Sequence, residues 1–221
     1  MRLTSVDLQV FLTAYPGMLL APTMNGVIVL AGTFDFEASW EGVVVKDSYD
    51  LRIEVGSYPE VLPVVFENGG RIPRRIDEHV FESSGRLCLG SELRLRQIIG
   101  PNFNLMTFAD QCVVPFLYAA TRRASEGRFV FGELSHGHAG LFEDYQEILG
   151  VRGESAVRAA LRILAVKRST ADRHPCPCGC GKRLAQCGYR HRIEALRQLG
   201  PRKIFQNVFE GLGGSVAGGK H

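Results

Sequence analysis

The sequence has no apolar run long enough to cross a bilayer, and its start lacks the apolar core of a secretory signal. The longest apolar stretches, 26–32 and 112–120, fall well short of the roughly 18 residues that a membrane-spanning helix requires. These absences argue against a membrane protein and against a secreted one. We therefore expect a cytoplasmic protein with no membrane partner.

The chain also has little net charge, because 26 Lys and Arg stand against 23 Asp and Glu. This balance conceals two unlike halves. Residues 1–150 hold 12 basic and 19 acidic residues, a net charge of −7, whereas residues 151–221 hold 14 and 4, a net charge of +10. The length and the asymmetry predict one sizeable acidic domain and a smaller basic module with a different partner.

Cysteine is scarce outside one short segment. Four of the six cysteines fall within 176–187, whereas Cys88 and Cys112 stand alone. So uneven a spacing argues against a disulfide framework and favours a metal cluster plus two free thiols in a reducing compartment. Cys112 lies on the apolar face of a helical pattern, and we expect it in the core.

Apolar periodicity predicts an α+β fold. An N-terminal helix over 5–15, ended by Pro16 and Gly17, precedes β-rich segments with turn signals between them. The expected strands, which form a three- or four-stranded antiparallel meander, are 24–36, 42–55 and 61–67. No sustained period is found between 68 and 103, and long irregular segments tend to be functional. Further helices are expected over 105–123, with a kink at Pro115, and over 141–149, 154–167, 193–199 and 202–212.

The densest chemical signal is the segment His174–His191, which contains four thiols and two imidazoles. Tetrahedral zinc takes four thiolate or imidazole ligands, and a structural site closes all four positions. The ion can therefore order a short segment that has no hydrophobic core of its own. We expect a structural zinc ion here.

This segment resembles the SEC-C motif, the small zinc module at the C-terminus of the preprotein translocase ATPase. The motif reads Cys-Pro-Cys-Gly-Ser-Gly-Lys, then four residues, then Cys-Cys or Cys-His. The resemblance implies that Cys176, Cys178 and Cys187 are ligands. Gly188 occupies the position of the fourth ligand, so we expect His191 to replace it, with Cys180 as the alternative.

Cys88 lies in the irregular segment after a Ser-Ser-Gly turn, with Arg86 nearby to favour a thiolate. Taken by itself it is either a partly exposed nucleophile or a small buried apolar residue. Its neighbourhood matches a longer pattern in the correct order. The matching residues are Tyr58-Pro59, Pro63, Val65, Phe66, His79, Gly85 and Leu87-Cys88-Leu89.

Over residues 1–150 the chain resembles the ubiquitin-conjugating enzyme (UBC-like) superfamily, and most closely its divergent bacterial members in anti-phage and conjugation operons. The resemblance implies a UBC-like fold, an antiparallel meander sheet packed on helices, with a C-terminal zinc knuckle as an addition. After residue 150 we expect three further parts of the chain: a helix and linker over 151–173, the zinc motif over 174–193 and a basic helical tail over 194–221.

The resemblance also implies covalent catalysis, in which a Cys88 thiolate accepts an acyl group from a partner's thioester and a target amine then attacks it. In the family an Asn after the His stabilises the oxyanion, but Val80 and Phe81 occupy the comparable positions. His79, or the pair His136 and His138, is the candidate replacement. Asp77 is a candidate for positioning the amine.

We therefore expect a bacterial transferase that works with an activating enzyme in phage defence. Its modifier would be a ubiquitin-like protein or the C-terminus of an anti-phage nucleotidyltransferase, and its acceptor an amine of a target protein. The alternative is an inactive UBC-like scaffold whose basic zinc tail binds protein or nucleic acid. Aromatic residues are few among the basic ones, so nucleic acid is not the expected partner. A third function, metal-dependent hydrolysis, is not expected, because the sequence has no His-Glu motif to support it.

Overall fold

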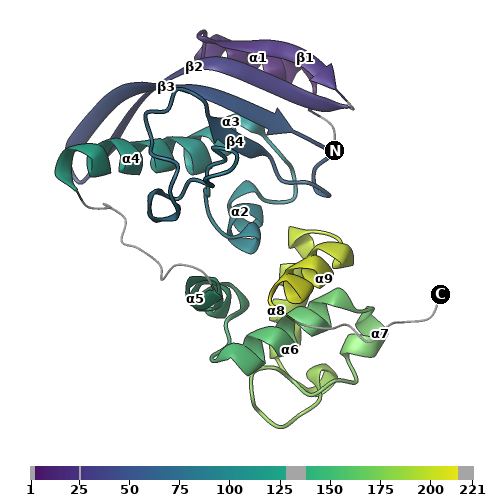
Figure 1. The fold of residues 1–221 in the computed structure, drawn as a ribbon. Coiled ribbons are helices and arrows are strands. Elements are labelled where there is room, and N and C mark those ends of the chain that lie inside the picture. The colour runs from purple at the N-terminus through teal and green to yellow at the C-terminus, as the bar shows by residue number, and fades with distance from the viewer. Residues whose placement is uncertain (1–2, 25, 128–137, 214–221) are drawn as a thin grey trace. The chain divides into compact units, whose positions relative to one another are not determined.

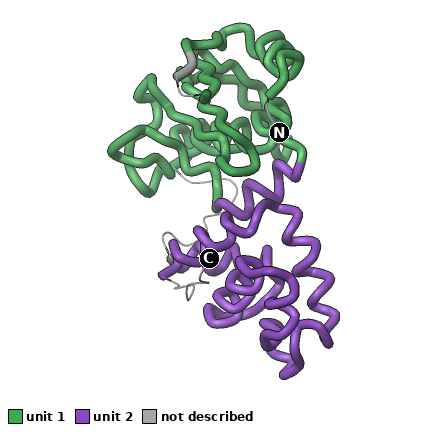
Figure 2. The backbone as a smooth tube through the Cα atoms, turned by 90° about the vertical axis from the view of Figure 1, so that its right-hand side faces the viewer, with its two compact units in different colours: residues 1–91, 102–133 green, residues 92–101, 134–221 purple. Residues whose placement is uncertain are grey.

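The computed structural model describes residues 3–24, 26–127 and 138–213. The chain divides into two compact units (Figure 2). Unit 1 comprises residues 1–91 and 102–133, and unit 2 comprises residues 92–101 and 134–221. Helices and one antiparallel sheet together make the chain α+β, as the sequence predicts. Among the described residues, no helix is both long and apolar enough to cross a membrane.

Unit 1 is built on a four-stranded meander of β1 (Met18–Met24), β2 (Val27–Trp40), β3 (Val43–Val55) and β4 (Val64–Glu67), in that order (Figure 1). Each strand pairs antiparallel with the next. Positive φ at Glu41 and Gly42 closes the β2–β3 hairpin in two residues, as the right-handed twist of the strands favours. The predicted meander is confirmed. The first strand was missing from the prediction because Pro22 interrupts its pattern.

One face of the sheet forms the core of unit 1. Every second residue from Tyr49 to Val55 of β3 is buried, which is the period of a half-buried strand. Helix α4 (Val114–Glu126) packs against β2 and β3, and the Tyr118 hydroxyl donates to the Val43 carbonyl at 3.1 Å. Helix α1 (Ser5–Ala14) begins with a capping box in which Thr4 is the N-cap.

The predicted helix over 105–123 exists but is not continuous. It runs as α3 (Leu105–Phe108), a π-helical turn η2 (Ala109–Val113) and α4. Pro115 lies at the start of α4, where its missing N–H is tolerated. The irregularity is thus the wider turn before the proline rather than a kink at it. Cys112 is buried in this turn, so the prediction that it belongs to the core is confirmed.

The segment after β4 is irregular as expected until Gly90, and it contains one short 3₁₀ helix, η1 (Ile76–Glu78). Its later part differs from the prediction. Residues Glu92–Ile99 form helix α2, which belongs to unit 2. Its Arg96 is buried and pairs with Glu92 one turn earlier at 2.9 Å, an arrangement that hydrophobic periodicity does not reveal.

Unit 2 is helical. Besides α2 it contains α5 (His138–Leu149), α6 (Glu154–Ala165), α7 (Arg168–Ala171), η3 (Leu184–Gln186), α8 (Tyr189–Leu196), η4 (Arg197–Leu199) and α9 (Arg202–Gly211). One core joins these helices to the cysteine segment, because Leu161 and Phe205 share it with Cys176, Leu184 and Ile193.

The boundary between the units therefore differs from the division predicted at residue 150. Helix α5 packs against α6, and Phe142, Tyr145 and Ile148 are buried in the core of unit 2. Helix α6 is strongly amphipathic, and α5 and α9 pack against it, so that its apolar face is buried. The cysteine segment is thus part of a larger helical unit rather than a separate knuckle.

Candidate functional site

Four cysteines converge at one end of the cysteine segment. The Sγ atoms of Cys176, Cys178, Cys180 and Cys187 all lie within 4.8 Å of one another. The Sγ atom of Cys178 is 3.2 Å from that of Cys176 and 3.6 Å from that of Cys187. Four sulfur ligands at such separations match a tetrahedral structural zinc site, so the cluster could hold a metal ion.

The fourth member of this group is Cys180, the alternative ligand, and not His191, the ligand we expected. His191 lies on the exposed side of α8, in the turn that follows Gly188. The sequence spacing left both choices open, because the course of the loop from Cys178 to Lys182 decides which side chain points inward. Glycines at 179 and 181, both with positive φ, give that loop its sharp turn.

Backbone hydrogen bonds hold the cluster in shape. The Cys176 N–H donates to the Lys182 carbonyl at 2.8 Å, and Pro175 bridges to Arg183. The Tyr189 N–H donates to the Cys187 Sγ at 3.5 Å and, with the neighbouring thiols, lowers the pKa of Cys187 to about 7. Burial raises the pKa of Cys176. The charge of a bound cation would offset that raised pKa, since zinc takes thiolates as ligands.

The second candidate is Cys88, which is half-buried. Its backbone N–H donates to the His79 carbonyl at 2.7 Å, and the preceding Leu87 N–H donates to Val65 of β4 at 2.8 Å. Val80 and Leu87 form a bridge one residue further into the same loop. The loop from 80 to 87 is therefore closed at its base, and His79 and Cys88 lie opposite each other there.

The acidic residues before His79 face helix α4. Arg123 of α4 contacts Glu78 at 2.9 Å and Asp77 at 3.4 Å, and Arg75 contacts Asp77 at 3.3 Å. Asp77, predicted to position the amine, is thus held in ion pairs that anchor η1 to α4. His79 follows η1 with a left-handed backbone, φ 55°.

The side chains of the two other predicted histidines lie outside the described part of the chain. His136 lies outside the described residues. His138 is the first residue of α5 in unit 2, and its side chain also lies outside the described part. Val80 is buried, and Phe81 lies under the guanidinium of Arg86, 4.2 Å from its ring centroid. Neither side chain offers a hydrogen-bond donor.

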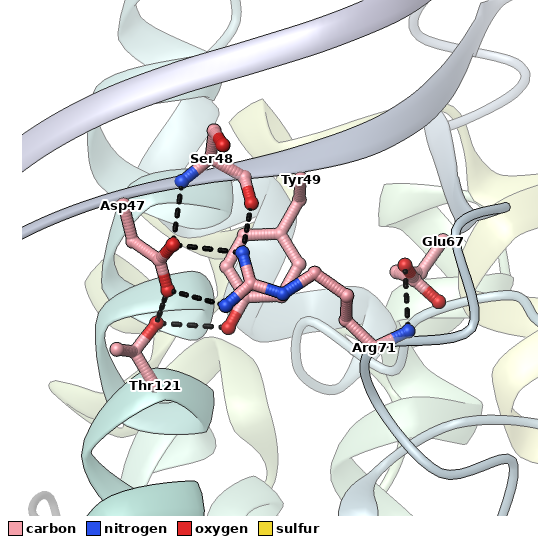
Figure 3. Close-up of polar contacts among 6 residues, drawn as sticks. All are labelled: Asp47, Ser48, Tyr49, Glu67, Arg71 and Thr121. Atoms are coloured by element: carbon pink, nitrogen blue, oxygen red, sulfur yellow. Dashed lines mark hydrogen bonds and ion pairs between the residues drawn. The ribbon is translucent and has the colours of Figure 1, made fainter.

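A polar network that the sequence did not reveal precedes this loop (Figure 3). Arg71 donates to Asp47 and to the Ser48 carbonyl, and its guanidinium lies 4.4 Å from the centroid of the Tyr49 ring. Thr121 of α4 donates to Asp47 at 3.0 Å. The hydrogen bonds of the Arg71 guanidinium are thus made within the chain, to Asp47 and Ser48, and not to a partner protein. No local pattern reveals this pairing, because Asp47 and Arg71 are 24 residues apart.

Comparisons with protein-family models, with curated proteins and with solved structures find no match to this chain. The resemblances to the UBC-like superfamily and to the SEC-C motif therefore rest on the residues quoted for them. Function has to be argued from the geometry of Cys88 and of the cysteine cluster.

Proposed function

We propose that the chain is a UBC-like acyltransferase that carries a modifier as a thioester on Cys88 and passes it to an amine of a target protein. The observation that supports this most directly is the hydrogen bond from the Cys88 N–H to the His79 carbonyl. It fixes a half-buried thiol at the base of a short loop, with a histidine opposite.

In the first step the Cys88 thiolate attacks the carbonyl carbon of a partner's thioester, and the partner's thiolate leaves as the new thioester forms. In the second step a target amine attacks that carbonyl, loses a proton to solvent or to a base, and displaces the Cys88 thiolate. Both steps pass through a tetrahedral oxyanion that needs a hydrogen-bond donor. His79 is our candidate, because Val80 and Phe81 offer no side-chain donor.

The structure modifies the role that we propose for Asp77. Its carboxylate is paired with Arg75 and Arg123, so its contribution is to hold η1, and with it His79, against α4. The partners that we propose are an activating enzyme and a modifier that is either a ubiquitin-like protein or a nucleotidyltransferase C-terminus, in phage defence. The cysteine cluster of unit 2 would hold a structural zinc ion and take no part in the transfer.

The test is a reconstitution with the proteins encoded beside this one, followed by a non-reducing gel. We expect a thiol-labile adduct with the wild type, none with Cys88→Ala, and a thiol-resistant ester with Cys88→Ser. Cys112→Ala is the matched control, because that thiol is buried and its loss should leave the adduct unchanged. An adduct that persists in Cys88→Ala would contradict the proposal.

The alternative is an inactive UBC-like scaffold, and one observation favours it. The two positions after His79 hold Val80, which is buried, and Phe81, so neither supplies the hydrogen-bond donor that the resemblance implies there. His79→Ala separates the two functions. A wild type that is charged and transfers, with a large loss of both steps in folded His79→Ala, supports the enzyme. A wild type that a competent activating partner never charges supports the scaffold.

A further inference from the structure

Unit 2 carries a groove beside its cysteine cluster. Helices α6 and α9 pack against each other, and with His174 they border a space of about 320 Å³. Its floor is apolar and consists of Ala159, Ile163 and Phe209, of which the last two are buried. A hollow of this size holds one or two side chains.

The rim of the groove is basic. Arg158 and Arg162 are one helical turn apart on α6, on the same face, and His174 also lines the groove. Arg158 already donates to Glu154, at 2.9 Å from Nε and 2.7 Å from Nη2. Within the described part of the chain, the side chains of Arg162 and His174 have no hydrogen-bond or ion-pair partner, and no acidic residue lines the groove.

An apolar floor beside the unpaired guanidinium of Arg162 has a specific complement. The planar guanidinium of Arg162 matches a carboxylate in two-point geometry, and the floor takes an apolar side chain. A nucleic acid is poorly served here, because Phe209, the aromatic residue of the groove, is buried and presents no exposed face for a base to stack on. The net charge of +10 over residues 151–221 would attract an acidic partner from a distance.

We propose that this groove binds an extended acidic peptide segment of a partner protein, with a carboxylate on Arg162 and an adjacent apolar side chain on the floor formed by Ala159 and Ile163. The inference concerns unit 2 alone. It does not depend on thioester chemistry at Cys88, because binding is measured directly.

The experiment titrates the full zinc-loaded chain with a capped hexapeptide, Gly-Asp-Leu-Asp-Phe-Gly, and follows the NMR signals of Ala159 and Ile163. The same peptide with Asn in place of Asp tests the need for carboxylates, and a thymidine oligonucleotide of about ten residues tests a nucleic acid. Arg162→Glu reverses the free rim charge, whereas Arg152→Glu is the matched control: Arg152 is also an exposed residue of unit 2 but lies outside the groove.

We expect saturable shifts with the acidic peptide, binding about tenfold weaker with the Asn peptide and with Arg162→Glu, and no change with Arg152→Glu. The absence of shifts up to about 5 mM peptide would overturn the proposal, since that excludes even millimolar affinity. Equal binding of both peptides, or an equal loss with Arg152→Glu, would overturn it as well. If the oligonucleotide shifts the same signals at lower concentration, the groove is a nucleic-acid site instead.

Discussion

Arg71 donates to both carboxylate oxygens of Asp47, from Nη1 at 2.7 Å and from Nη2 at 2.9 Å (Figure 3). The same carboxylate accepts a hydrogen bond from Thr121, so it joins strand β3, the segment after β4 and helix α4. That segment leads into η1 and then to Cys88. The network therefore fixes the start of the segment on which the proposed nucleophile lies.

Asp47→Asn should destabilise unit 1 at neutral pH by about 1 kcal/mol, a modest value because Arg71 is about half exposed. The hydrogen bonds from Arg71 lower the pKa of Asp47 below its ordinary value of 3.8. A lowered pKa contributes stability above that value, and the contribution is lost as the pH falls through the folded-state pKa. The difference between wild type and variant should therefore shrink as the pH falls below the ordinary value of 3.8.

Urea unfolding followed by the fluorescence of Trp40, the single tryptophan of the chain, measures this in unit 1. Glu37→Gln is the control, because the pair of Glu37 with Lys46 is largely exposed and should contribute little. A constant difference between wild type and Asp47→Asn across this pH range would mean that Arg71 does not stabilise the ionised carboxylate.

The sequence predicted the fold where a pattern is local. The meander follows from alternating strands separated by turn residues, and α6 follows from its 3.6-residue period. Helix α2 was missed because its Leu-Arg-Leu-Arg run alternates like a strand, while Arg96 is buried through its pairing with Glu92. The boundary near residue 150 was misplaced because no local pattern shows that α5 packs against α6 and shares its core.

For the candidate sites too, the sequence predicted what depends on local spacing and missed what depends on the course of the chain. The spacing of the cysteines predicted a metal cluster, since the ligands of such a site lie close together in sequence. It did not decide between Cys180 and His191, because the turn geometry at Gly179 and Gly181 settles which group faces inward. The opposition of His79 and Cys88 likewise depends on a bridge across a loop, which no local pattern encodes.

Cys180→Ser should reduce the zinc affinity of the chain strongly, whereas His191→Ala should leave it nearly unchanged. The reason is that Cys180 lies in the group of four sulfurs, and His191 does not. Cobalt substitution measures the donor set directly, because the absorption of a tetrahedral site depends on how many thiolates it contains. Wild type and His191→Ala should give the same four-sulfur spectrum. A spectrum that loses a nitrogen ligand in His191→Ala would restore His191 as the fourth ligand.

Cys112 should react slowly with iodoacetamide in the folded chain, since burial raises the pKa of its thiol to about 11. At pH 8 only about one thiol in a thousand would be ionised. Because the folded state retains the proton, the neutral thiol favours folding, and this contribution is lost as the pH rises above its ordinary value of 9.0. Mass spectrometry of digested protein compares this thiol with the half-buried Cys88. Faster labelling of Cys112 than of Cys88 would contradict its place in the core.

Tyr189→Phe should weaken zinc retention although Tyr189 is not a ligand. Its hydroxyl donates to the Leu149 carbonyl at the end of α5 at 2.6 Å, while its backbone N–H donates to the Cys187 Sγ. Removing the hydroxyl leaves a buried carbonyl without that partner, at a cost of about 1 to 2 kcal/mol. Metal binding and folding are linked, so the same free energy should appear as easier metal loss to a chelator.

Tyr15→Phe is the matched control for this test. Tyr15→Phe also loses a hydroxyl hydrogen bond, to Asp110 at 3.0 Å, but Tyr15 belongs to unit 1, whereas the cysteine segment belongs to unit 2. The variant should lower the stability of unit 1 and leave the chelator midpoint for zinc unchanged. Equal zinc retention in Tyr189→Phe and in the wild type would mean that the cluster folds independently of α5. In that case the shared core of Cys176, Leu184 and the helices would not couple the metal to unit 2.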